Sequence, residues 1–473
     1  MDLESVYARL PGFAQNLACT YAGLRIRRDR YDGKFRFLLS DAETRNAWTT
    51  SQVMAYRDQC LEAYVEHCAK TVPHVREQFK ALGIAPRDIR AIEDLRMFPV
   101  LSKADVVANS SRLQSEAVNL RQCSLSHTSG TTGSGLRFPV TGEAYRTQWA
   151  VWWRYRRWHG IDMTTRCGYF GGRSIVPIAQ KDPPFWRYDL ARHQVLFSGY
   201  HISQATLPLY VHELRRQRLP WLCGYPSLLT LLACYIVDTG CDLGYTPRWV
   251  TTLAENLLPR QKKMIDKAFG VTPRQHYGMA EGAANISECE MGRLHVDEDF
   301  AAVEFIPEEG IDSCRVVGTA FSNAATAFLR YEVGDRVRVS EEPSCPCGRP
   351  GRLVASIDGR LEDYVIRRDG SMVGRMDHVF KDLVNVREAQ IVQENPGRIT
   401  IRIVRGAFYN DRDEKYLLAE IVKRLGSETD VKIDYRESLP RGSGGKLRFV
   451  ISTLHNGRIG RTGMTPQGIQ SSA

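Results

Sequence analysis

Residues 127–135 read HTSGTTGSG, a segment whose hydroxyl side chains and glycines suit phosphate binding. Hydroxyl and backbone N–H groups donate to phosphate oxygens, and glycines let the backbone approach them closely. The segment is not a Walker loop, because no Gly-Lys-Ser/Thr follows at the required spacing, and its glycines do not fit the dinucleotide fingerprint. Composition alone would also allow a flexible polar linker. The residues that carry the phosphate interpretation are Ser129, Gly130, Thr131, Thr132 and Gly133.

Four further motifs follow in a fixed order, and each contains side chains suited to nucleotide chemistry. They are YGMAE (277–281), YEVGD (331–335), GRLEDY (359–364) and PRGSGGK (440–446). Glu281 could hold Mg²⁺ against phosphate oxygens, and Asp335 could accept hydrogen bonds from both ribose hydroxyls. Lys446 could bring positive charge to a transition state. Taken singly, these residues are a surface acid, a turn aspartate and a solvated lysine. Their order along one chain predicts an ATP-handling site.

A second group of residues has the composition of a zinc site. Cys289 and His295 lie close together, and Cys345 and Cys347 follow about fifty residues later. Three thiolates and an imidazole are a standard tetrahedral zinc set, and a closed set of four ligands would be structural. The Cys-x-Cys spacing is tighter than that of the usual zinc finger. Two buried thiols beside a capped turn are therefore an equal alternative.

Length and composition indicate a globular protein with more than one domain. The chain has 473 residues, of which 43% are hydrophobic and 25% charged, and it is too long for one hydrophobic core. Its twelve cysteines form no dense framework, as in proteins with reduced thiols. The first residues lack the apolar core of a secretory signal, and the apolar run at residues 222–237 is shorter than a membrane span. We therefore expect a cytoplasmic protein without a membrane span.

The net charge of +10 would suit anionic ligands, a membrane surface or nucleic acid. The basic residues are dispersed, apart from clusters at residues 154–157 and 215–218. No zinc-finger, homeodomain or RNA-recognition signature accompanies them. We expect a solvated basic surface together with a nucleotide site, and no nucleic-acid partner.

The elements that position these motifs alternate between short apolar runs and helical patterns, which is typical of an α/β fold with largely parallel strands. Expected strands are residues 167–170, 194–197, 221–223, 249–253 and 274–277, and expected helices are residues 49–70, 141–158 and 259–269. Pro73 is expected to mark the end of the first helix. The runs at residues 123–125 and 136–140 could pair as a hairpin around the phosphate-binding segment.

The pattern of apolar and polar residues changes after residue 359, which indicates a domain boundary. Residues 1–359 form the expected large domain of mixed sheets and helices, which carries the zinc candidate at residues 289–347. Residues 360–455 form a small α+β domain, with strands at 390–394, 400–404 and 431–435 and a helix at 414–425. Residues 456–473 have few apolar side chains and are expected to be a disordered tail.

In this order, HTSGTTGSG, YGMAE, YEVGD, GRLEDY and the closing Gly445-Lys446 resemble the motif series of adenylate-forming enzymes, the acyl-CoA synthetase superfamily. Within it, the chain is similar to the phenylacetate–CoA ligase group, especially its capsular-polysaccharide-biosynthesis branch. Supporting stretches are residues 185–187, 196–201, 224–227 and 254–256. The resemblance implies an α/β fold with a large N-terminal adenylate-forming domain and a small, mobile C-terminal lid domain.

The resemblance also implies roles for particular residues. The hydroxyl and glycine residues 129–133 would hold the β- and γ-phosphates, and Glu281 would serve Mg²⁺. The adenine would be bordered by Ala254, Glu255, Tyr277 and Gly278. Asp335 and Arg360 would grip the ribose, Glu362 would be the hinge, and Lys446 would be the adenylation lysine. Related proteins bind a structural metal with residues similar to Cys289, His295, Cys345 and Cys347, which favours zinc.

Two departures from the family pattern bear on these roles. Ala280 stands where the family usually has threonine or serine, so one contact to the α-phosphate or the carboxylate is missing from the pattern. The phosphate-binding segment continues Ser134-Gly135 in place of the common lysine-proline ending. Its hydroxyl and amide donors are retained.

The expected function is an ATP- and Mg²⁺-dependent ligase that adenylates a carboxylic acid, releases pyrophosphate and transfers the acyl group to an acceptor. The resemblance favours the thiol of CoA, whereas the polysaccharide branch also allows an amine on an amino acid or amino sugar. A non-catalytic nucleotide-binding scaffold is the alternative class, and retention of Glu281, Asp335, Arg360 and Lys446 argues against it. Either a monomer or a homodimer is compatible with the sequence.

Overall fold

The structure is a computed structural model that describes residues 3–128, 136–309, 311–360, 365–368, 372–373, 376, 379, 385–441 and 447–454. The chain divides into two compact units. Unit 1 comprises Met1–Gly359 with Pro440–Leu447, and unit 2 comprises Arg360–Leu439 with Arg448–Ala473. The expected tail at residues 456–473 lies outside the described residues.

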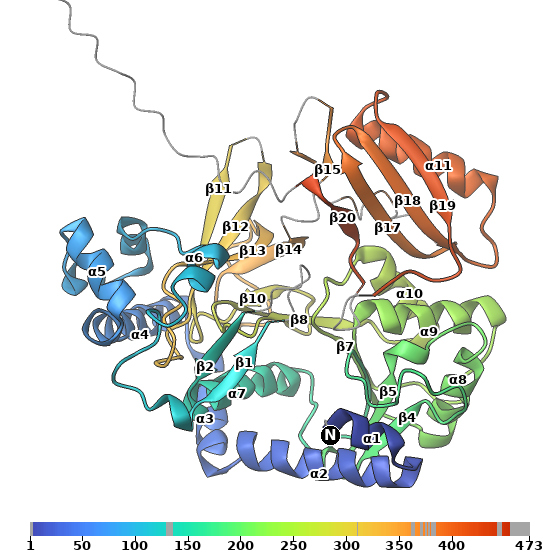
Figure 1. The fold of residues 1–473 in the computed structure, drawn as a ribbon, viewed down its shortest axis with the longest axis horizontal. Helices are drawn as coiled ribbons and strands as arrows, with labels where there is room; N and C mark the ends of the chain where they lie inside the picture. The colour runs from blue at the N-terminus through green and yellow to red at the C-terminus, as the bar shows by residue number, and fades with distance from the viewer. Residues whose placement is uncertain are drawn as a thin grey trace, which may run out of the picture. The chain divides into compact units, whose positions relative to one another are not determined.

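Unit 1 is built on a sheet in which twelve strands can be followed through the described residues, in the order β11-β12-β13-β14-β10-β9-β8-β7-β6-β3-β5-β4 (Figure 1). Neighbours from β8 to β5 run parallel, and β4 is antiparallel at the edge. The strands of this half are β3 (Cys167–Gly171), β4 (Trp186–Asp189), β5 (Gln194–Ser198), β6 (Trp221–Gly224), β7 (Trp249–Thr252) and β8 (Arg274–Gly278). The α/β class is confirmed, and the expected parallel strands form this half of the sheet, so the sheet as a whole is mixed.

The other half of the sheet is antiparallel where its pairing is described. Its strands are β9 (Asn285–Glu288), β10 (Leu294–Val296), β11 (Ala302–Glu308), β12 (Ile311–Thr319), β13 (Tyr331–Val339) and β14 (Leu353–Arg360). A separate hairpin pairs β1 (Ser124–His127) with β2 (Arg137–Val140), as the sequence predicts. This hairpin flanks residues 129–135, which lie outside the described part of the chain.

Helices connect the parallel strands, since such connections cannot be made by short turns. They are α8 (Leu207–Gln217), α9 (Pro226–Thr239) and α10 (Pro259–Phe269). The last has the bounds expected from its sequence: it begins at Pro259 and ends before Gly270, whose φ of 68° suits glycine at a helix C-terminus.

Helix α7 (Gly142–Trp158) follows the hairpin and supplies much of the site described below. The Thr141 hydroxyl accepts a hydrogen bond from the Ala144 backbone N–H and so caps its first turn. Four of its side chains, Trp149, Trp152, Trp153 and Arg156, follow the i, i+3, i+4, i+7 spacing of one helix face. This spacing allows them to line one wall together.

Helix α2 (Gly12–Arg30) packs on β4 and on the short helix η5 (Leu190–Arg192). A Cβ atom at Gly23 would lie 2.1 Å from Asp189 Oδ1, so this close approach requires glycine. The approach brings the Arg27 guanidinium to the Ala191 carbonyl at 2.9 Å. The end of α2 therefore reaches the edge of the parallel strands.

The remaining helices of unit 1 precede the hairpin; they are α1 (Leu3–Arg9), α3 (Gly33–Thr44), α4 (Thr50–Thr71), α5 (Pro73–Leu82) and α6 (Lys103–Ala108). Pro73 marks the end of α4, as expected from the sequence, and it also begins α5. The helix before it ends at Thr71, and Pro73 opens the next helix, because proline costs no hydrogen bond in the first turn.

In unit 2, a sheet of order β19-β18-β17-β20 packs with helix α11 (Asp411–Leu425) around an apolar core. The strands are β17 (Val386–Asn395), β18 (Arg398–Arg405), β19 (Asp430–Tyr435) and β20 (Val450–Ser452), and β15 (Val365–Ile366) pairs separately with β16 (Met372–Val373). Asn410 caps the helix by accepting from the Arg412 backbone N–H. The strands and helix expected here from the sequence are present.

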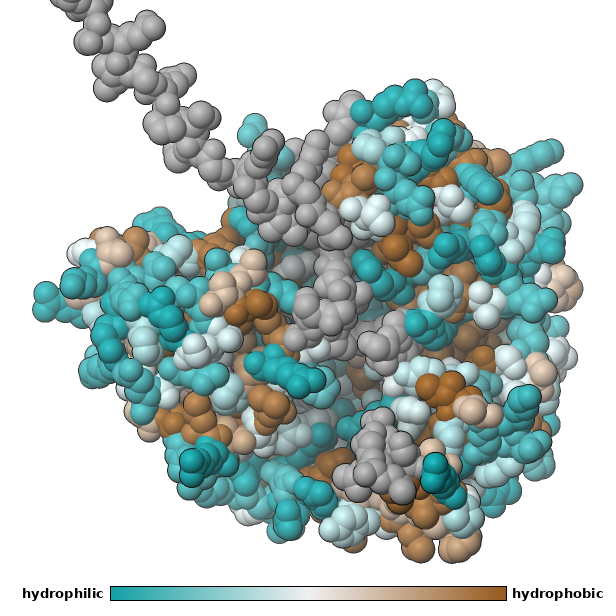
Figure 2. All heavy atoms as spheres, viewed as in Figure 1, coloured by the Kyte–Doolittle hydropathy of each residue, from teal (hydrophilic) through white to brown (hydrophobic). Residues whose placement is uncertain are grey.

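The face shown in Figure 2 mixes hydrophilic residues with small groups of hydrophobic ones. Exposed apolar side chains on α2 include Phe13, Leu17, Tyr21 and Leu24. In the described part of the chain, no helix combines the length and apolar character that crossing a bilayer requires.

Candidate active site

Two of the predicted nucleotide residues meet in unit 1. Tyr277 lies near the end of β8, Asp335 lies on β13, and the Tyr277 hydroxyl donates to Asp335 Oδ2 at 2.7 Å. The two residues are 58 positions apart in sequence. Glu281, from the turn after β8, has its carboxylate 3.4 Å from the Tyr331 hydroxyl. The carboxylates predicted for ribose and for Mg²⁺ thus lie on neighbouring parts of one fold.

Ala254 and Glu255 follow β7, at the carboxyl end of the parallel strands, where open α/β sheets bind their ligands. Ala254 has a left-handed backbone with φ of 67°, a conformation that costs an alanine free energy and is concentrated at functional turns. This backbone conformation turns the chain directly after the strand. The turn places Glu255 against the start of α9.

Glu255 connects this turn to the segment Pro440–Leu447, which belongs to unit 1. Its carboxylate accepts hydrogen bonds from the Ser227 hydroxyl and backbone N–H, both at 3.0 Å, and from the Leu447 backbone N–H at 2.9 Å. Arg441 donates to the Ser227 hydroxyl at 2.7 Å. The residues on both sides of 442–446 are therefore anchored beside the predicted adenine-binding turn.

Several predicted residues lie outside what the structure describes. These are the phosphate-binding residues Ser129, Gly130, Thr131, Thr132 and Gly133, the hinge residue Glu362, the lysine Lys446 and the side chain of Arg360. Their roles stay predictions.

A cavity of about 330 Å³ lies beside these motifs, within the size range of small-molecule sites. Gly278 and Ala254 from the nucleotide motifs form part of its wall. The wall continues across β7, β6 and β3 to β5 and the end of α2, with α7 contributing its aromatic face. The aromatic lining includes Trp149, Trp152, Trp153, Tyr169 and Trp221.

Sequence reasoning missed most of this wall. It treated the basic cluster at residues 154–157 as solvated surface, but Arg154 is 4% exposed and Arg156 lines the cavity. The spacing of the three tryptophans and Arg156 on α7 is the signal that could have revealed the wall. Arg173, Gly171 and His276 also line the cavity.

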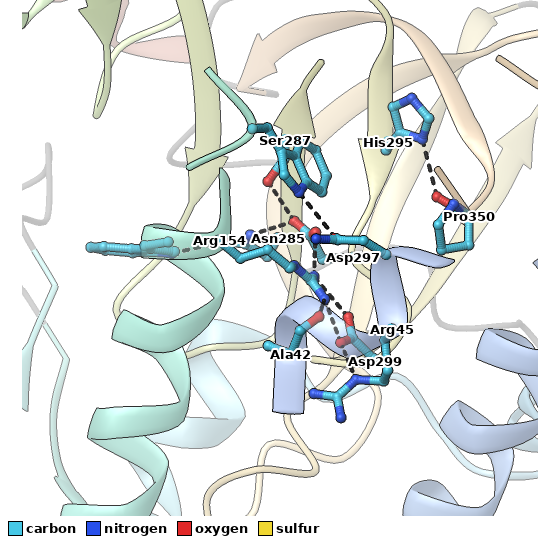
Figure 3. Close-up of polar contacts among 12 residues, drawn as sticks. Ala42, Arg45, Arg154, Asn285, Ser287, His295, Asp297, Asp299 and Pro350 are labelled. Atoms are coloured by element: carbon cyan, nitrogen blue, oxygen red, sulfur yellow. Dashed lines mark hydrogen bonds and ion pairs between the residues drawn. The ribbon is translucent and has the colours of Figure 1, made fainter. Parts of the chain in front are cut away.

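A buried network of ion pairs anchors helix α7, which supplies part of the cavity wall (Figure 3). Arg154, on α7, donates to Asp297 Oδ1 at 2.7 Å and to both carboxylate oxygens of Asp299 at 2.6 and 2.9 Å. Arg45 reaches Asp299 Oδ2 at 2.6 Å. Burial raises the pKa of Asp297 to about 6 against the opposing charge of Arg154. At Asp299 the charges of Arg154 and Arg45 overcome burial and lower the pKa to about 2.

The network also orients a histidine in the cavity wall. The side-chain oxygen of Asn285 accepts a hydrogen bond from the Trp152 indole N–H at 2.8 Å. Because an indole N–H can only donate, this contact fixes which end of the Asn285 amide is the oxygen and which is the NH₂ group. That NH₂ group lies 2.6 Å from Asp297 Oδ2 and 3.1 Å from His276 Nε2. His276 Nε2 therefore accepts, and the ring proton lies on Nδ1.

The charge state of His276 agrees with this hydrogen-bond pattern. Burial and the nearby positive charge of Arg156 lower the pKa of His276 to about 3. The imidazole is consequently neutral near pH 7 and offers Nδ1–H as a donor. A neutral donor in this wall can orient a substrate oxygen without adding charge.

The four predicted metal ligands come together in unit 1. Cys289 follows β9, His295 lies on β10, and Cys345 and Cys347 lie between β13 and β14, which pairs with β10. Their ligand atoms all lie within 4.8 Å of one another. Cys289 Sγ is 3.7 Å from Cys345 Sγ, and Cys347 Sγ is 3.4 Å from His295 Nε2.

These separations fit a tetrahedral zinc site. With Zn–S near 2.3 Å and Zn–N near 2.0–2.1 Å, the edges of the tetrahedron are ~3.8 Å between two sulfurs and ~3.6 Å between sulfur and nitrogen. His295 Nδ1 lies 3.0 Å from the Pro350 carbonyl, which places the ring proton on Nδ1 and leaves Nε2 for a metal. Burial raises the pKa of the Cys289 and Cys345 thiols, so a cation is what would favour their thiolate forms.

Comparison with known proteins agrees with this architecture. Residues 365–453 match the model of the CapK C-terminal domain. Protein CapK of Staphylococcus aureus is 25% identical over 96% of this chain and all of its own length. Phenylacetate-coenzyme A ligase of Escherichia coli (strain K12) is 35% identical over 68% of this chain and 74% of its own.

A solved structure shares the fold. It is a crystal structure of 2-hydroxyisobutyryl-CoA ligase in the postadenylation state, in complex with R3-HIB-AMP, with a TM-score of 0.67 and 16% identity over 87% of this chain and 92% of that chain. The fold and the relatives define an acyl-adenylate-forming enzyme. The chain belongs to the phenylacetate–coenzyme A ligase family.

Proposed function

We propose that this chain adenylates a carboxylic acid held in the cavity of unit 1 and transfers the acyl group to the thiol of CoA. One observation carries the proposal: Gly278 and Ala254 belong both to the nucleotide motifs and to the cavity wall. An acid in the cavity would therefore meet the α-phosphate of a nucleotide held by these motifs. The thiol acceptor is supported by the 35% identical relative, a phenylacetate–coenzyme A ligase.

In the first half-reaction, a carboxylate oxygen of the acid attacks the α-phosphorus of ATP. The bond from that phosphorus to the bridging oxygen breaks, and pyrophosphate leaves. In the second half-reaction, the thiol sulfur attacks the acyl carbon, its proton passes to solvent, and AMP leaves with the carbon–oxygen bonding pair. The adenylate is needed because AMP is a far better leaving group than hydroxide.

The roles of the site residues follow from their positions and from the family resemblance. Asp335, oriented by the Tyr277 hydroxyl, would bind the ribose together with Arg360, and Glu281 would hold the Mg²⁺ that neutralises phosphate charge. Because the Glu255 carboxylate already binds Ser227 and Leu447, its side chain would position the segment that carries the adenylation lysine.

The phosphate-binding residues 129–133 and Lys446 complete the proposed machinery. Lys446 would stabilise the negative charge that develops at the α-phosphate during adenylation. Rotation of residues 360–455 about Glu362 would move the small domain from the position used for adenylation to the position used for acyl transfer. The Cys289, His295, Cys345 and Cys347 group would hold a structural zinc.

An amine acceptor is the second candidate, because residues 365–453 match the CapK C-terminal domain and the resemblance to the capsular-polysaccharide branch allows an amine as well as a thiol. The product would then be an amide on an amino acid or amino sugar, in the synthesis of a capsular polysaccharide. Adenylation of the acid is common to both candidates, so they differ only in the second half-reaction.

Carboxylate-dependent exchange of pyrophosphate into ATP tests adenylation separately from transfer. We expect exchange with at least one acid of an aryl, fatty and sugar-acid panel, and Lys446→Ala should slow it by on the order of a hundredfold while ATP still binds. CoA consumption, compared with capture by amino acids and amino sugars, then assigns the acceptor. Unchanged exchange in Lys446→Ala would contradict the role of the lysine, and thioester formation no faster than hydrolysis would exclude CoA.

A further inference from the structure

The cavity wall has an unusual charge composition. Among its described residues are five arginines, and neither aspartate nor glutamate lines it. The arginines are Arg27, Arg30, Arg156, Arg173 and Arg192. Of these, Arg192 is held by Asp189 at 2.6 Å. For the other four, no ion pair with a carboxylate of the described residues is found within 4.0 Å. The wall therefore carries positive charge that the described protein does not neutralise.

Three of these arginines gather around one part of the wall. The positive charges of Arg192 and Arg30 both act on the Arg173 guanidinium, and all three side chains line the cavity. Arg173 is exposed to solvent and lines the cavity. Arg30 is held by the Tyr145 hydroxyl at 2.6 Å and lies 3.9 Å above the Trp149 ring. Neither of these contacts neutralises its charge.

This cluster and the nucleotide motifs occupy different parts of the cavity. Gly278 ends β8, and Arg173 follows the end of β3, which is three strands away in the sheet order. Three strand spacings correspond to roughly 14 Å between the backbones. The lining also includes the flat apolar surfaces of Trp149, Trp152 and Tyr169. Trp149 packs against Arg30, Trp152 packs against His276, and the two indole rings contact each other. A ligand that spans the cavity meets the adenylation motifs at one end and the arginine cluster at the other.

We propose that the acid adenylated by this chain carries a second anionic group, which the cluster of Arg30, Arg173 and Arg192 binds, on a flat apolar body that packs between the aromatic side chains. Guanidinium groups bind carboxylates, phosphates and sulfates through paired N–H donors. Aromatic walls favour an aromatic body over an aliphatic one. This inference rests on the proposed function, because it assumes that the first carboxylate is the one adenylated.

Matched acids that differ only in the second anion test the proposal. Pyrophosphate exchange is compared for benzoate with terephthalate, and for phenylacetate with 4-carboxyphenylacetate, with 4-phosphonophenylacetate and succinate as further arms. We expect kcat/KM to be at least tenfold higher for the dianionic aryl acid of each pair, since a hydrogen-bonded charge pair contributes about ten- to a hundredfold. The phosphono acid shows whether a carboxylate or a phosphate-like anion fits better, and succinate shows whether the aromatic body is needed.

Arg173→Gln is the diagnostic variant, because Arg173 faces the cavity and no hydrogen bond of its side chain is found among the described residues. It should reduce the preference for the dianionic acid by about tenfold or more, whereas Arg157→Gln, on the outer side of α7 and paired with Glu43, should keep it. Quenching of tryptophan fluorescence measures binding of the same acids without ATP. If Arg173→Gln fails to fold by circular dichroism, Arg30→Gln is measured in the same way.

The outcomes separate this inference from the proposed function. Exchange with monoanionic acids that equals or exceeds exchange with their dianionic partners overturns the second-anion proposal and leaves adenylation intact. An unchanged preference in a folded Arg173→Gln protein overturns it as well, as does weaker ATP binding without any change in acid preference. Binding of acids without exchange of pyrophosphate for any of them contradicts the proposed function instead.

Discussion

Replacement of Arg154 by methionine should strongly destabilise unit 1. Methionine retains much of the length of the side chain but removes all four described hydrogen bonds of the guanidinium. Two carboxylates then remain in the interior, those of Asp297 and Asp299, which are 4% and 6% exposed. The expected effect follows from leaving these groups charged without their shared partner.

Breaking a buried ion pair costs ~3–5 kcal/mol. Asp299 keeps Arg45, and Asp297 keeps hydrogen bonds from Ser287 and Asn285, so we expect about 3 kcal/mol. The entropy of unfolding is ~2.1 cal/mol/K per residue, which for a unit as large as Met1–Gly359 gives ~0.8 kcal/mol/K. The melting temperature of unit 1 should therefore fall by ~4 °C.

The loss of stability caused by Arg154→Met should also depend on pH. The pKa of Asp297 is already raised to about 6 by burial, and removing the Arg154 charge raises it further. At pH 5.5 the carboxyl group of the variant binds a proton, and the cost of a buried charge is relieved. The difference in melting temperature between Arg154→Met and the wild type should consequently be smaller at pH 5.5 than at pH 7.5.

Differential scanning calorimetry at the two pH values measures both effects. Arg157→Met is the matched control on the same helix, because Arg157 pairs with Glu43 at the surface and should contribute ~0–1 kcal/mol. A shift for Arg154→Met no larger than for Arg157→Met would refute the importance of the network. A larger loss at pH 5.5 than at pH 7.5 would refute the assignment of the raised pKa.

Three further expectations concern the metal group, the nucleotide pair and the cavity histidine. Protein purified without added zinc should contain about one zinc per chain. Cys347→Ser should lower this content, whereas Cys123→Ser, which lies outside the metal group, should not. A zinc content near zero in the wild type and both variants rejects the site. Tyr277→Phe removes the hydrogen bond to Asp335 and should weaken ATP binding about three- to tenfold in calorimetric titration; equal affinity would contradict a ribose contact. The lowered pKa of His276, about 3 against ~6.5 in the unfolded chain, makes stability fall by up to ~1.4 kcal/mol per pH unit as pH drops below 6.5. His276→Gln should reduce this acid-induced loss, and an identical decrease in melting temperature between pH 7.5 and 5.5 would show that His276 does not titrate as inferred.

Much of the local structure could be predicted because it depends on neighbouring residues. Apolar runs with the right lengths anticipated the parallel strands, and Pro259 and Gly270 anticipated both ends of α10. Pro73 correctly indicated the end of one helix, and the structure shows that it also begins the next, because the same residue suits both sides of a helix boundary.

The nucleotide motifs could be predicted for a different reason, since each combines rare residue types in a fixed order. The order indicated a shared site but not the contact between Tyr277 and Asp335, which joins strands from separate halves of the sheet order. The composition of the metal group likewise left zinc and two buried thiols as equal alternatives. Pairing of β10 with both β9 and β14 brings its four ligands together.

The sequence by itself determined the class of enzyme and the α/β fold, and it predicted which residues take part in adenylation, because these depend on motifs and periodicity along the chain. Only the tertiary structure decided where the charges lie. Arg154, Arg156 and Arg157 are close in sequence, yet they become a buried network residue, a cavity residue and a surface residue. The physical reason is that helix α7 turns each side chain to a different neighbour, and those neighbours come from distant parts of the chain. The arginine cluster of the cavity is therefore visible only after the strands and helices have packed.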